Sequence, residues 1–480
     1  MNDSASVNSL PLPPPRRGRL VSLWSDLREA VVGTQQDFTE GSIGRGILLL
    51  SVPMVLEMSL ESLFVVCDVF FVARLGADAV ATVGLTESML ILIYAMALGL
   101  CMSTTAMVAR RIGEKDPEAA SVTAVQAVAL GIVISVPIAL SGYFFGPALL
   151  RLMGASPAII QTGSGFTSIM LGTNMVIVLL FLMNGVFRGA GDASIAMRVL
   201  WLANFINIVL DPCFIFGLGP FPQLGVTGAA VATSIGRGTG VLFQLFLLAR
   251  GTGRIKVGRK QLRLDLHIMA RLVRVSIGGI VQFLISTASW MGLVRIISSF
   301  GGTAVAGYTI AVRVIYFTIL PSWGMAGAAA TMVGQNLGAG KPARAEKAVW
   351  LAGLANMCFL AGIALVFIFF AEPVIGLFTR DAAIVPYGVS CLRYLSYGYL
   401  FYAYGMVMVQ AFNGAGDTAT PTLINLFCYW LVQIPLAYAL AFTAKLGPRG
   451  VFLAIPITAA LVAVVSVILF RRGKWKQQKI

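Results

Sequence analysis

The sequence predicts an all-α polytopic membrane protein with twelve transmembrane helices in two parallel six-helix repeats. Composition is the first observation behind this prediction: the 480 residues are 58% hydrophobic and only 11% charged, whereas a soluble domain carries about 25% charged residues. The other two are a series of long apolar segments and a second half that repeats the first. With a mean hydropathy of +0.86, the chain requires lipid as its solvent.

Twelve apolar segments are each long enough to cross about 30 Å of hydrocarbon at about 1.5 Å per residue. In chain order they are residues 46–72, 80–108, 120–145, 164–187, 195–219, 226–249, 270–297, 304–334, 347–371, 388–412, 419–443 and 449–470.

The segments outside these spans are polar and basic. The N-terminal region has a Pro/Arg run at 11–19 and then an amphipathic stretch from about Leu20 to Val32. No apolar core follows the basic residues, so we expect a tail that rests on the membrane surface rather than a secretory signal. The expected domains are a cytoplasmic tail (1–45), an N-lobe (46–249), a basic cytoplasmic linker (250–269), a C-lobe (270–470) and a basic cytoplasmic tail (471–480).

The positive charges predict the orientation. Most of the 35 Lys and Arg residues lie in the two tails and in the loops on the same side of the membrane. By the positive-inside rule both termini are cytoplasmic, in a multi-pass protein of the inner (plasma) membrane. This placement explains the net charge of +15 without a nucleic-acid partner, because the charge lies along the inner leaflet.

An internal repeat relates the two halves at a constant offset of 225 residues. Its clearest element is Gly-Ala-Gly-Asp at 189–192 and again at 414–417, where glycine permits a tight helix reversal. We interpret the motif as a turn. The alternative is that Asp192 or Asp417 acts as a gate. Six helices is an even number, so both halves enter the membrane in the same direction and enclose a cavity about an axis along the membrane normal. Two such lobes can rock to give alternating access.

Intramembrane acids are confined to the first half. Five of the 20 acidic residues fall inside spans, and each must face a cavity or a partner because a carboxylate in hydrocarbon is costly. They are Glu57, Glu61, Asp68, Glu87 and Asp211.

Helix geometry groups these acids. At 100° per residue, Glu57, Glu61 and Asp68 fall within about 40° of one another on the first helix. Asn207 and Asp211 share one face of the fifth helix. Pro212 follows, and a proline there leaves a backbone carbonyl free to line a site.

A common depth predicts an ion-coupling site. Asp68, Glu87, Asp211 and Thr233 lie at depths that agree within about 6 Å. We assign ion coupling to Asp68, Asn207, Asp211 and Thr233, whose oxygens could take up a proton or hold Na⁺. The alternative is a buried, hydrogen-bonded group that only braces the helices.

The remaining acids have several interpretations. Glu57, Glu61 and Glu87 could bind protons or a cationic substrate, and the first two could instead pair with an arginine. Two arginines, Arg237 and Arg313, lie deep within spans and have no acid within one helical turn.

The sequence contains no Walker motif, nucleophile–base pair or metal-ligand cluster, so we expect neither an enzyme nor a cofactor beyond H⁺ or Na⁺. An ion gradient is then the expected driving force. Together with the acidic interior this predicts a secondary transporter that exports small organic cations.

Several motifs, in this order and spacing, resemble the multidrug and toxic compound extrusion (MATE) family over about residues 39–472. They are the segments at 39–42, 67–72, 207–212, 228–233, 333–340 and 412–417. The resemblance implies a V-shaped, two-lobe antiporter of organic cations coupled to H⁺ or Na⁺, and thus multidrug efflux. Members with an N-lobe site use the residue types found here at Asp68, Asn207, Asp211 and Thr233. Another branch uses acids on helices 7 and 10. This chain lacks those acids, since Gln282 of the seventh span is the residue that corresponds to Glu57 at the 225-residue offset.

Other functions compete with this one. A lipid-linked oligosaccharide flippase of the related superfamily is the first alternative, and it would need a more basic cavity for pyrophosphate. A receptor or scaffold with an inactive ion site is the second. The expected partners are small organic cations and membrane lipids, with no nucleic acid, and the chain is expected to be a monomer.

Overall fold

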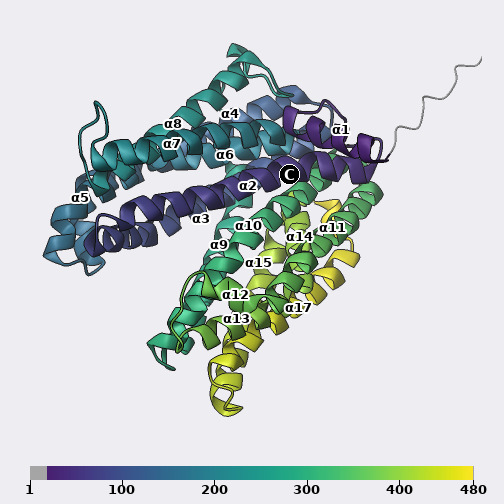
Figure 1. Cartoon of the computed structure of the whole chain (residues 1–480). Helices are drawn as coiled ribbons and strands as arrows, with labels where there is room; N and C mark the ends of the chain where they lie inside the picture. The colour runs from purple at the N-terminus through teal and green to yellow at the C-terminus, as the bar shows by residue number, and fades with distance from the viewer. Residues whose placement is uncertain (1–18, 479) are drawn as a thin grey trace, which may run out of the picture.

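The structure is a computed structural model that describes residues 19–478 and 480, and the described residues form helices and no strands. Most of the Pro/Arg run, residues 11–18, lies outside the described residues. Figure 1 shows two helical lobes that diverge from one end, where α1 (Arg19–Val32) and the C-terminus also lie. We call that end the closed end and the opposite one the open end.

The first lobe contains the helices before the basic linker. In chain order they are α2 (Ile43–Ala73), α3 (Ala77–Gly113), α4 (Pro117–Leu152), α5 (Pro157–Gly172), α6 (Asn174–Ala190), α7 (Ala193–Phe216) and α8 (Val226–Arg250).

The second lobe contains the helices after it. They are α9 (Leu266–Ser298), α10 (Gly302–Gly338), α11 (Pro342–Phe369), α12 (Ala371–Gly376), α13 (Val385–Tyr397), α14 (Tyr399–Ala415), α15 (Ala419–Asn425), α16 (Ile434–Tyr438) and α17 (Pro448–Arg471). A π-helical segment at Leu426–Gln433 joins α15 to α16, and a second at Ala439–Thr443 continues α16, so these elements form one continuous segment.

These helices account for the twelve predicted spans. By length and apolar composition, nine described helical segments can cross a membrane, and the bent pair α5–α6 makes ten. The remaining two of the twelve predicted spans correspond to α2, which carries three of the intramembrane acids, and to the pair α13–α14, which is interrupted only at Gly398.

Helix boundaries confirm the repeat. α3 and α10 each have 37 residues, and both their ends differ by the offset found in the sequence. The starts of α4 and α11, and the ends of α6 and α14, do the same. After α6 and after α14 the Gly-Ala-Gly-Asp motif forms a turn, with Gly191 at φ 91° and Gly416 at φ 85°. Glycine adopts this left-handed conformation without steric cost, which explains the motif.

The two lobes meet at the closed end through reciprocal glycine contacts. A Cβ atom on Gly113 of α3 would overlap the carbonyl oxygen of Gln335 on α10. A Cβ atom on Gly338 of α10 would likewise overlap the carbonyl oxygen of Arg110 on α3. Each pair maps onto the other by the repeat, so the interface has an approximate twofold axis.

A second reciprocal pair lies deeper. A Cβ on Gly99 of α3 would lie 2.7 Å from the backbone nitrogen of Ile280 on α9, and one on Gly324 of α10 would lie 2.9 Å from that of Val55 on α2. Such distances are too short for any side chain to occupy. Backbone-to-backbone packing therefore seals the lobes together over their inner halves, and they separate toward the open end.

A segment at residues 33–42, which we call the N-terminal strap, crosses this seal on one side. Arg254 of the linker donates a hydrogen bond to the carbonyl of Gln36 (2.5 Å), and Lys341 of the second lobe donates one to that of Thr39 (3.0 Å). Phe38 is fully buried, with the Arg254 guanidinium 4.9 Å from its ring centre. The strap thus contacts both lobes at once.

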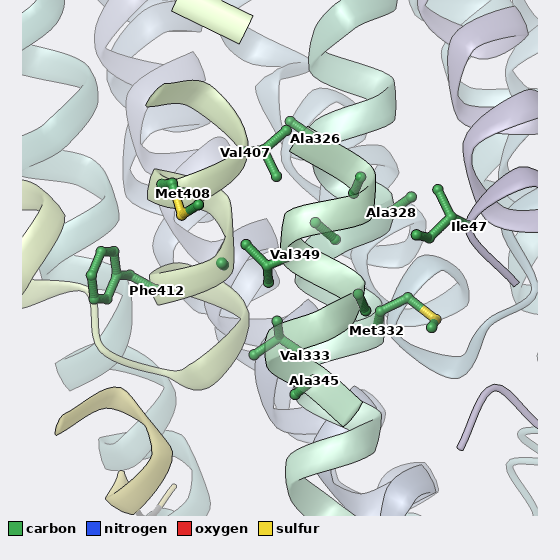
Figure 2. Packing of buried hydrophobic residues seen from close by; sticks show 14 of the residues in the cluster. Ile47, Ala326, Ala328, Met332, Val333, Ala345, Val349, Val407, Met408 and Phe412 are labelled. Atoms are coloured by element: carbon green, nitrogen blue, oxygen red, sulfur yellow. The ribbon is translucent and has the colours of Figure 1, made fainter. Parts of the chain in front are cut away.

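One hydrophobic core spans the lobes at this end. Figure 2 shows α10, α11 and α14 packed through Met332, Val349 and Met408, with Ile47 of α2 beside them. Phe38 of the strap belongs to the same cluster. The closed end is therefore held by apolar packing as well as by hydrogen bonds.

Candidate functional site

Close packing of α7 on α8 places the first two predicted site residues. Gly236 allows this approach, because a Cβ there would lie 2.6 Å from the carbonyl oxygen of Ala203. One turn away, the Asn207 side-chain amide donates a hydrogen bond to the Thr233 hydroxyl (2.9 Å). Both residues are buried. The structure therefore brings Asn207 and Thr233 together.

Asp211 lies one turn beyond Asn207 on α7 and is fully buried. Neither of its carboxylate oxygens has a hydrogen-bond partner among the described residues, and the same is true of Oδ1 of Asn207. Pro212 has no N–H to donate to the carbonyl of Ile208, which leaves another backbone oxygen on this helix without its usual partner. Buried polar atoms without partners are rare in native structures and require a physical explanation.

Asp68 completes the group from α2. Its carboxylate lies within electrostatic range of Asp211, and it makes no salt bridge with a described residue. Arg237 also lies within range of Asp68 but contacts another acid. The outer part of the first lobe therefore contains two carboxylates without a directly contacting cation.

A second polar layer lies deeper in the lobe. Arg237 of α8 is buried and pairs with Glu61 of α2 at 3.5 Å, while its other terminal nitrogen donates to the Tyr94 hydroxyl (3.1 Å). Asn204 of α7 donates to the second oxygen of Glu61 (3.1 Å). Glu61 is therefore neutralised by a basic residue from a neighbouring helix.

A third layer lies nearest the closed end. Glu57 is fully buried and forms an ion pair with Arg188 of α6, in which Nε and Nη2 of the arginine donate to its two oxygens. Asn184 also donates to Glu57 (3.2 Å) and accepts a hydrogen bond from Gln244 (2.6 Å). Thr331 of the second lobe donates to the carbonyl of Arg188 (3.1 Å), so this layer also contacts the lobe interface.

These pairs correct one part of the sequence interpretation. The fourth predicted span ends at residue 187, which puts Arg188 just outside it, but the Arg188 guanidinium lies in the interior beside Glu57. Arg237 has no acid within one turn of its own helix, yet its partner Glu61 comes from another helix. Of the alternatives for Glu57 and Glu61, pairing with an arginine is the arrangement observed.

Glu87 lies outside the Asn207–Thr233 pair but within electrostatic range of Asp68. It projects from α3 and lies within electrostatic range of Arg313 on α10, which belongs to the opposite lobe. Both side chains are exposed in the part of the molecule where the lobes diverge. The structure does not bring Glu87 into the Asn207–Asp211–Thr233 group.

Two adjoining cavities lie between the lobes. One, of about 200 Å³, is lined on the first-lobe side by the ion pairs of Glu57 and Glu61. The other, of about 430 Å³, is lined by aromatic side chains of the second lobe. Both cavities share Trp323 and Asn413. The aromatic residues of the larger cavity are Phe283, Trp290, Tyr316, Trp323, Tyr402 and Tyr429.

Asn184 and Arg188 of α6 are polar residues that sequence analysis missed, together with Asn204 of α7. Asn184 and Arg188 are four residues apart, as are Thr233 and Arg237 on α8, both of which the sequence had already indicated. Residues at this spacing share a helix face. The polar stripe on α6 was therefore a signal in the sequence, and it was missed because it contains no acid.

Ligand chemistry limits what the site can hold. Among residues 19–478 and 480, no group of three or more His, Cys, Asp or Glu side chains could hold a metal ion. A transition-metal centre is therefore not indicated in this part of the chain. Two carboxylates with amide, hydroxyl and backbone oxygens suit a proton or a hard monovalent cation.

Comparisons with known proteins agree with the fold. A probable multidrug resistance protein, YoeA of Bacillus subtilis, is 24% identical over 93% of this chain and 97% of its own length. An FAD transporter of Shewanella oneidensis is 25% identical over 90% of this chain and 95% of its own. The solved outward-facing structure of a MATE family multidrug resistance transporter has a TM-score of 0.86 and 29% identity, covering 92% of this chain and 98% of that one.

The family assignment rests on a direct match to each half of the chain. The MatE family model matches residues 53–213 and again 279–439, which correspond to the two repeats. It is a family of transporters rather than enzymes, which confirms the resemblance and the expectation that this protein is not an enzyme. The chain is a membrane protein that belongs to the MatE family.

Proposed function

We propose that this protein is a secondary active antiporter that exports small, largely cationic organic compounds in exchange for H⁺ or Na⁺. The observation that carries the proposal is the fully buried Asp211: its two carboxylate oxygens, like Oδ1 of Asn207 nearby, have no hydrogen-bond partner among residues 19–478 and 480. A buried charge without a partner is unfavourable. A bound proton or cation would remove that cost, which makes this group a suitable coupling site.

Charge balance supports the choice of residues. Arg188 and Arg237 neutralise Glu57 and Glu61, so these two acids add no net charge to the first lobe. Asp68 and Asp211 remain without a contacting cation. The coupling ion is therefore proposed to bind at Asp68, Asn207, Asp211 and Thr233, and Glu57 and Glu61 to shape the central cavity.

The cavities support the substrate class. A flat organic cation fits a chamber with Trp and Tyr faces, because aromatic rings attract cations and provide apolar area. The chamber of about 430 Å³ lies beside the acidic residues of the first lobe. Binding there, between two lobes that meet at one end only, is suited to alternating access.

Orientation is part of the proposal. The closed end carries α1, the C-terminus and the basic linker, so the positive-inside rule places it in the cytoplasm. The V-shaped cleft would then open to the outside of the plasma membrane. The protein is proposed to act as a monomer, because each chain contains both lobes and the cavities between them.

The testing experiment is ethidium transport by purified protein in proteoliposomes, with a pH gradient and a Na⁺ gradient imposed separately. We expect wild type to move ethidium under one gradient, and Asp211→Asn and Asp68→Asn to reduce transport to the level of protein-free liposomes. Glu372→Gln is the matched control, since Glu372 is an exposed acid on α12 at the open end. Full transport by Asp211→Asn would refute the coupling role, and no ethidium transport under either gradient would refute the cation antiporter.

A second candidate substrate is a flavin nucleotide. The FAD transporter relative favours it. In the same assay, flavin uptake without ethidium uptake would select this candidate. Neither the multidrug-resistance nor the flavin relative favours the oligosaccharide flippase.

A further inference from the structure

A third cavity, of about 810 Å³, lies at the closed end on the side opposite the N-terminal strap. It is formed by the end of α3, the start of α9, the turn before α15 and the C-terminal residues 478 and 480. Four arginines line it, together with only two acids. The arginines are Arg110, Arg111, Arg271 and Arg274.

The two acids leave most of this charge unneutralised. Glu114 is engaged by Arg111 at 2.7 Å. Asp417 accepts hydrogen bonds from the backbone N–H and the hydroxyl of Thr420. Arg271 and Arg274 form no salt bridge with any residue that the structure describes.

Arg110 gives an independent indication of a ligand. Only 8% of this residue is exposed, and its Nε has no hydrogen-bond partner among the described residues. One of its terminal nitrogens donates to the carbonyl of Gln478 (2.7 Å), so the guanidinium is fixed in the wall of the cavity. A buried, fixed guanidinium with a free donor is suited to an anion with several oxygens.

The internal repeat shows that the fold does not require these arginines. At the 225-residue offset, Arg110 and Arg111 correspond to Gln335 and Asn336, and Arg271 and Arg274 correspond to Gly46 and Leu49. On one side Phe38 of the strap packs against Gly46 and Gly191. On the other side Ile480 packs against Gly416, the equivalent of Gly191, and a cavity of about 810 Å³ lined by the arginines remains beside it.

We propose that the arginine cavity binds the phosphate headgroup of an anionic phospholipid. An apolar stripe on α9 supports a lipid over a free anion. Val273, Ile277 and Val281 are 37%, 54% and 36% exposed, and their four-residue spacing places them on one face that leads away from Arg274 toward the membrane interior. Basic pockets between transmembrane helices at a membrane surface bind such headgroups. The bound lipid would bridge the two lobes, because Arg110 comes from the first and Arg274 from the second.

The test measures lipid binding to the purified, delipidated full chain. Phosphatidylglycerol or phosphatidylcholine is added back, and retained lipid is counted by native mass spectrometry alongside the thermal unfolding midpoint. We expect selective retention of phosphatidylglycerol and a higher midpoint. Arg271→Ala/Arg274→Ala should weaken binding by about tenfold or more, since a hydrogen bond to a charged group contributes enough for that factor. Arg259→Ala/Lys260→Ala removes two exposed linker charges and serves as the matched control.

Two outcomes would overturn the proposal. Equal retention of phosphatidylglycerol by the Arg271/Arg274 variant and by the control would show that the cavity is not the site. A midpoint shift with inorganic phosphate as large as that with phosphatidylglycerol would assign the cavity to a soluble anion instead. Neither outcome depends on transport, so failure here is distinguishable from failure of the antiporter assignment.

Discussion

At the scale of single residues, the first lobe contains three polar layers with different degrees of charge compensation. Glu57 with Arg188 and Glu61 with Arg237 are paired across helices, whereas Asp211 has no partner in the part of the chain that the structure describes. The sequence predicted which helices carry acids and that Asp211 shares a face with Asn207. It could not predict the pairing, because partners on different helices are set by helix rotation and packing, which residue spacing does not show.

The innermost pair yields a stability prediction. Removing one partner of a buried ion pair leaves an uncompensated charge and costs about 3–5 kcal/mol. We expect Glu57→Gln and Arg188→Leu each to lower the thermal unfolding midpoint in detergent strongly. The double variant should be more stable than the sum of the two single effects implies, by about 1–3 kcal/mol. Strict additivity in this double-mutant cycle would show that the two side chains do not act as a pair.

At the scale of helices, the sequence predicted the number and order of spans better than their shape. Residues 164–187 were predicted as a single span, yet they belong to α5 and α6, which are bent by 40° at Thr173. The π-helical turns at Leu426–Gln433 were also not foreseen. Hydropathy records only how apolar a segment is, and a bend that keeps its apolar character leaves no trace in it.

Two glycines of α3 provide an element-scale prediction. A Cβ at Gly99 would lie 2.7 Å from the backbone nitrogen of Ile280, whereas a Cβ at Gly84 would meet nothing within 4 Å. Gly99→Ala should push α9 away and destabilise the closed end by about 1–3 kcal/mol. Gly84→Ala should be neutral or stabilising by up to about 1 kcal/mol, since alanine favours helix. Thermal unfolding in detergent measures both, and equal midpoints would mean that the α3–α9 contact does not limit stability.

At the scale of the whole molecule, the repeat predicted two lobes, and the match of α3 to α10 confirms the repeat. The direction of the axis along the membrane normal stays a prediction. The asymmetries could not be predicted as readily. Phe38 packs against Gly191 on one side, whereas Ile480 packs against the equivalent Gly416 on the other and leaves a cavity lined by arginines. The sequence placed the N-terminal residues and the arginines in tails and loops, where no periodicity constrains their position.

The lobe interface leads to a prediction about a divided chain. The glycine contacts at Gly113 and Gly338 and the apolar core at the closed end already align the lobes. Fragments 1–259 and 260–480, divided at the exposed Arg259–Lys260 bond of the linker, should therefore associate and transport ethidium when they are coexpressed. Copurification through a tag on one fragment measures association. If the fragments fail to copurify although each reaches the membrane, the covalent linker is needed to hold the lobes.

The reciprocity of those glycine contacts also bears on the origin of the chain. Gly113 against Gln335 and Gly338 against Arg110 are one contact made twice, as in an isologous dimer of identical protomers. A half-length ancestor with that surface would have had what it needed to pair with itself. The two protomers of such a homodimer would have been identical in sequence. The carboxylates of one lobe, the aromatic chamber of the other, and a phenylalanine opposite an arginine cavity all require two halves free to diverge, which a fused gene provides.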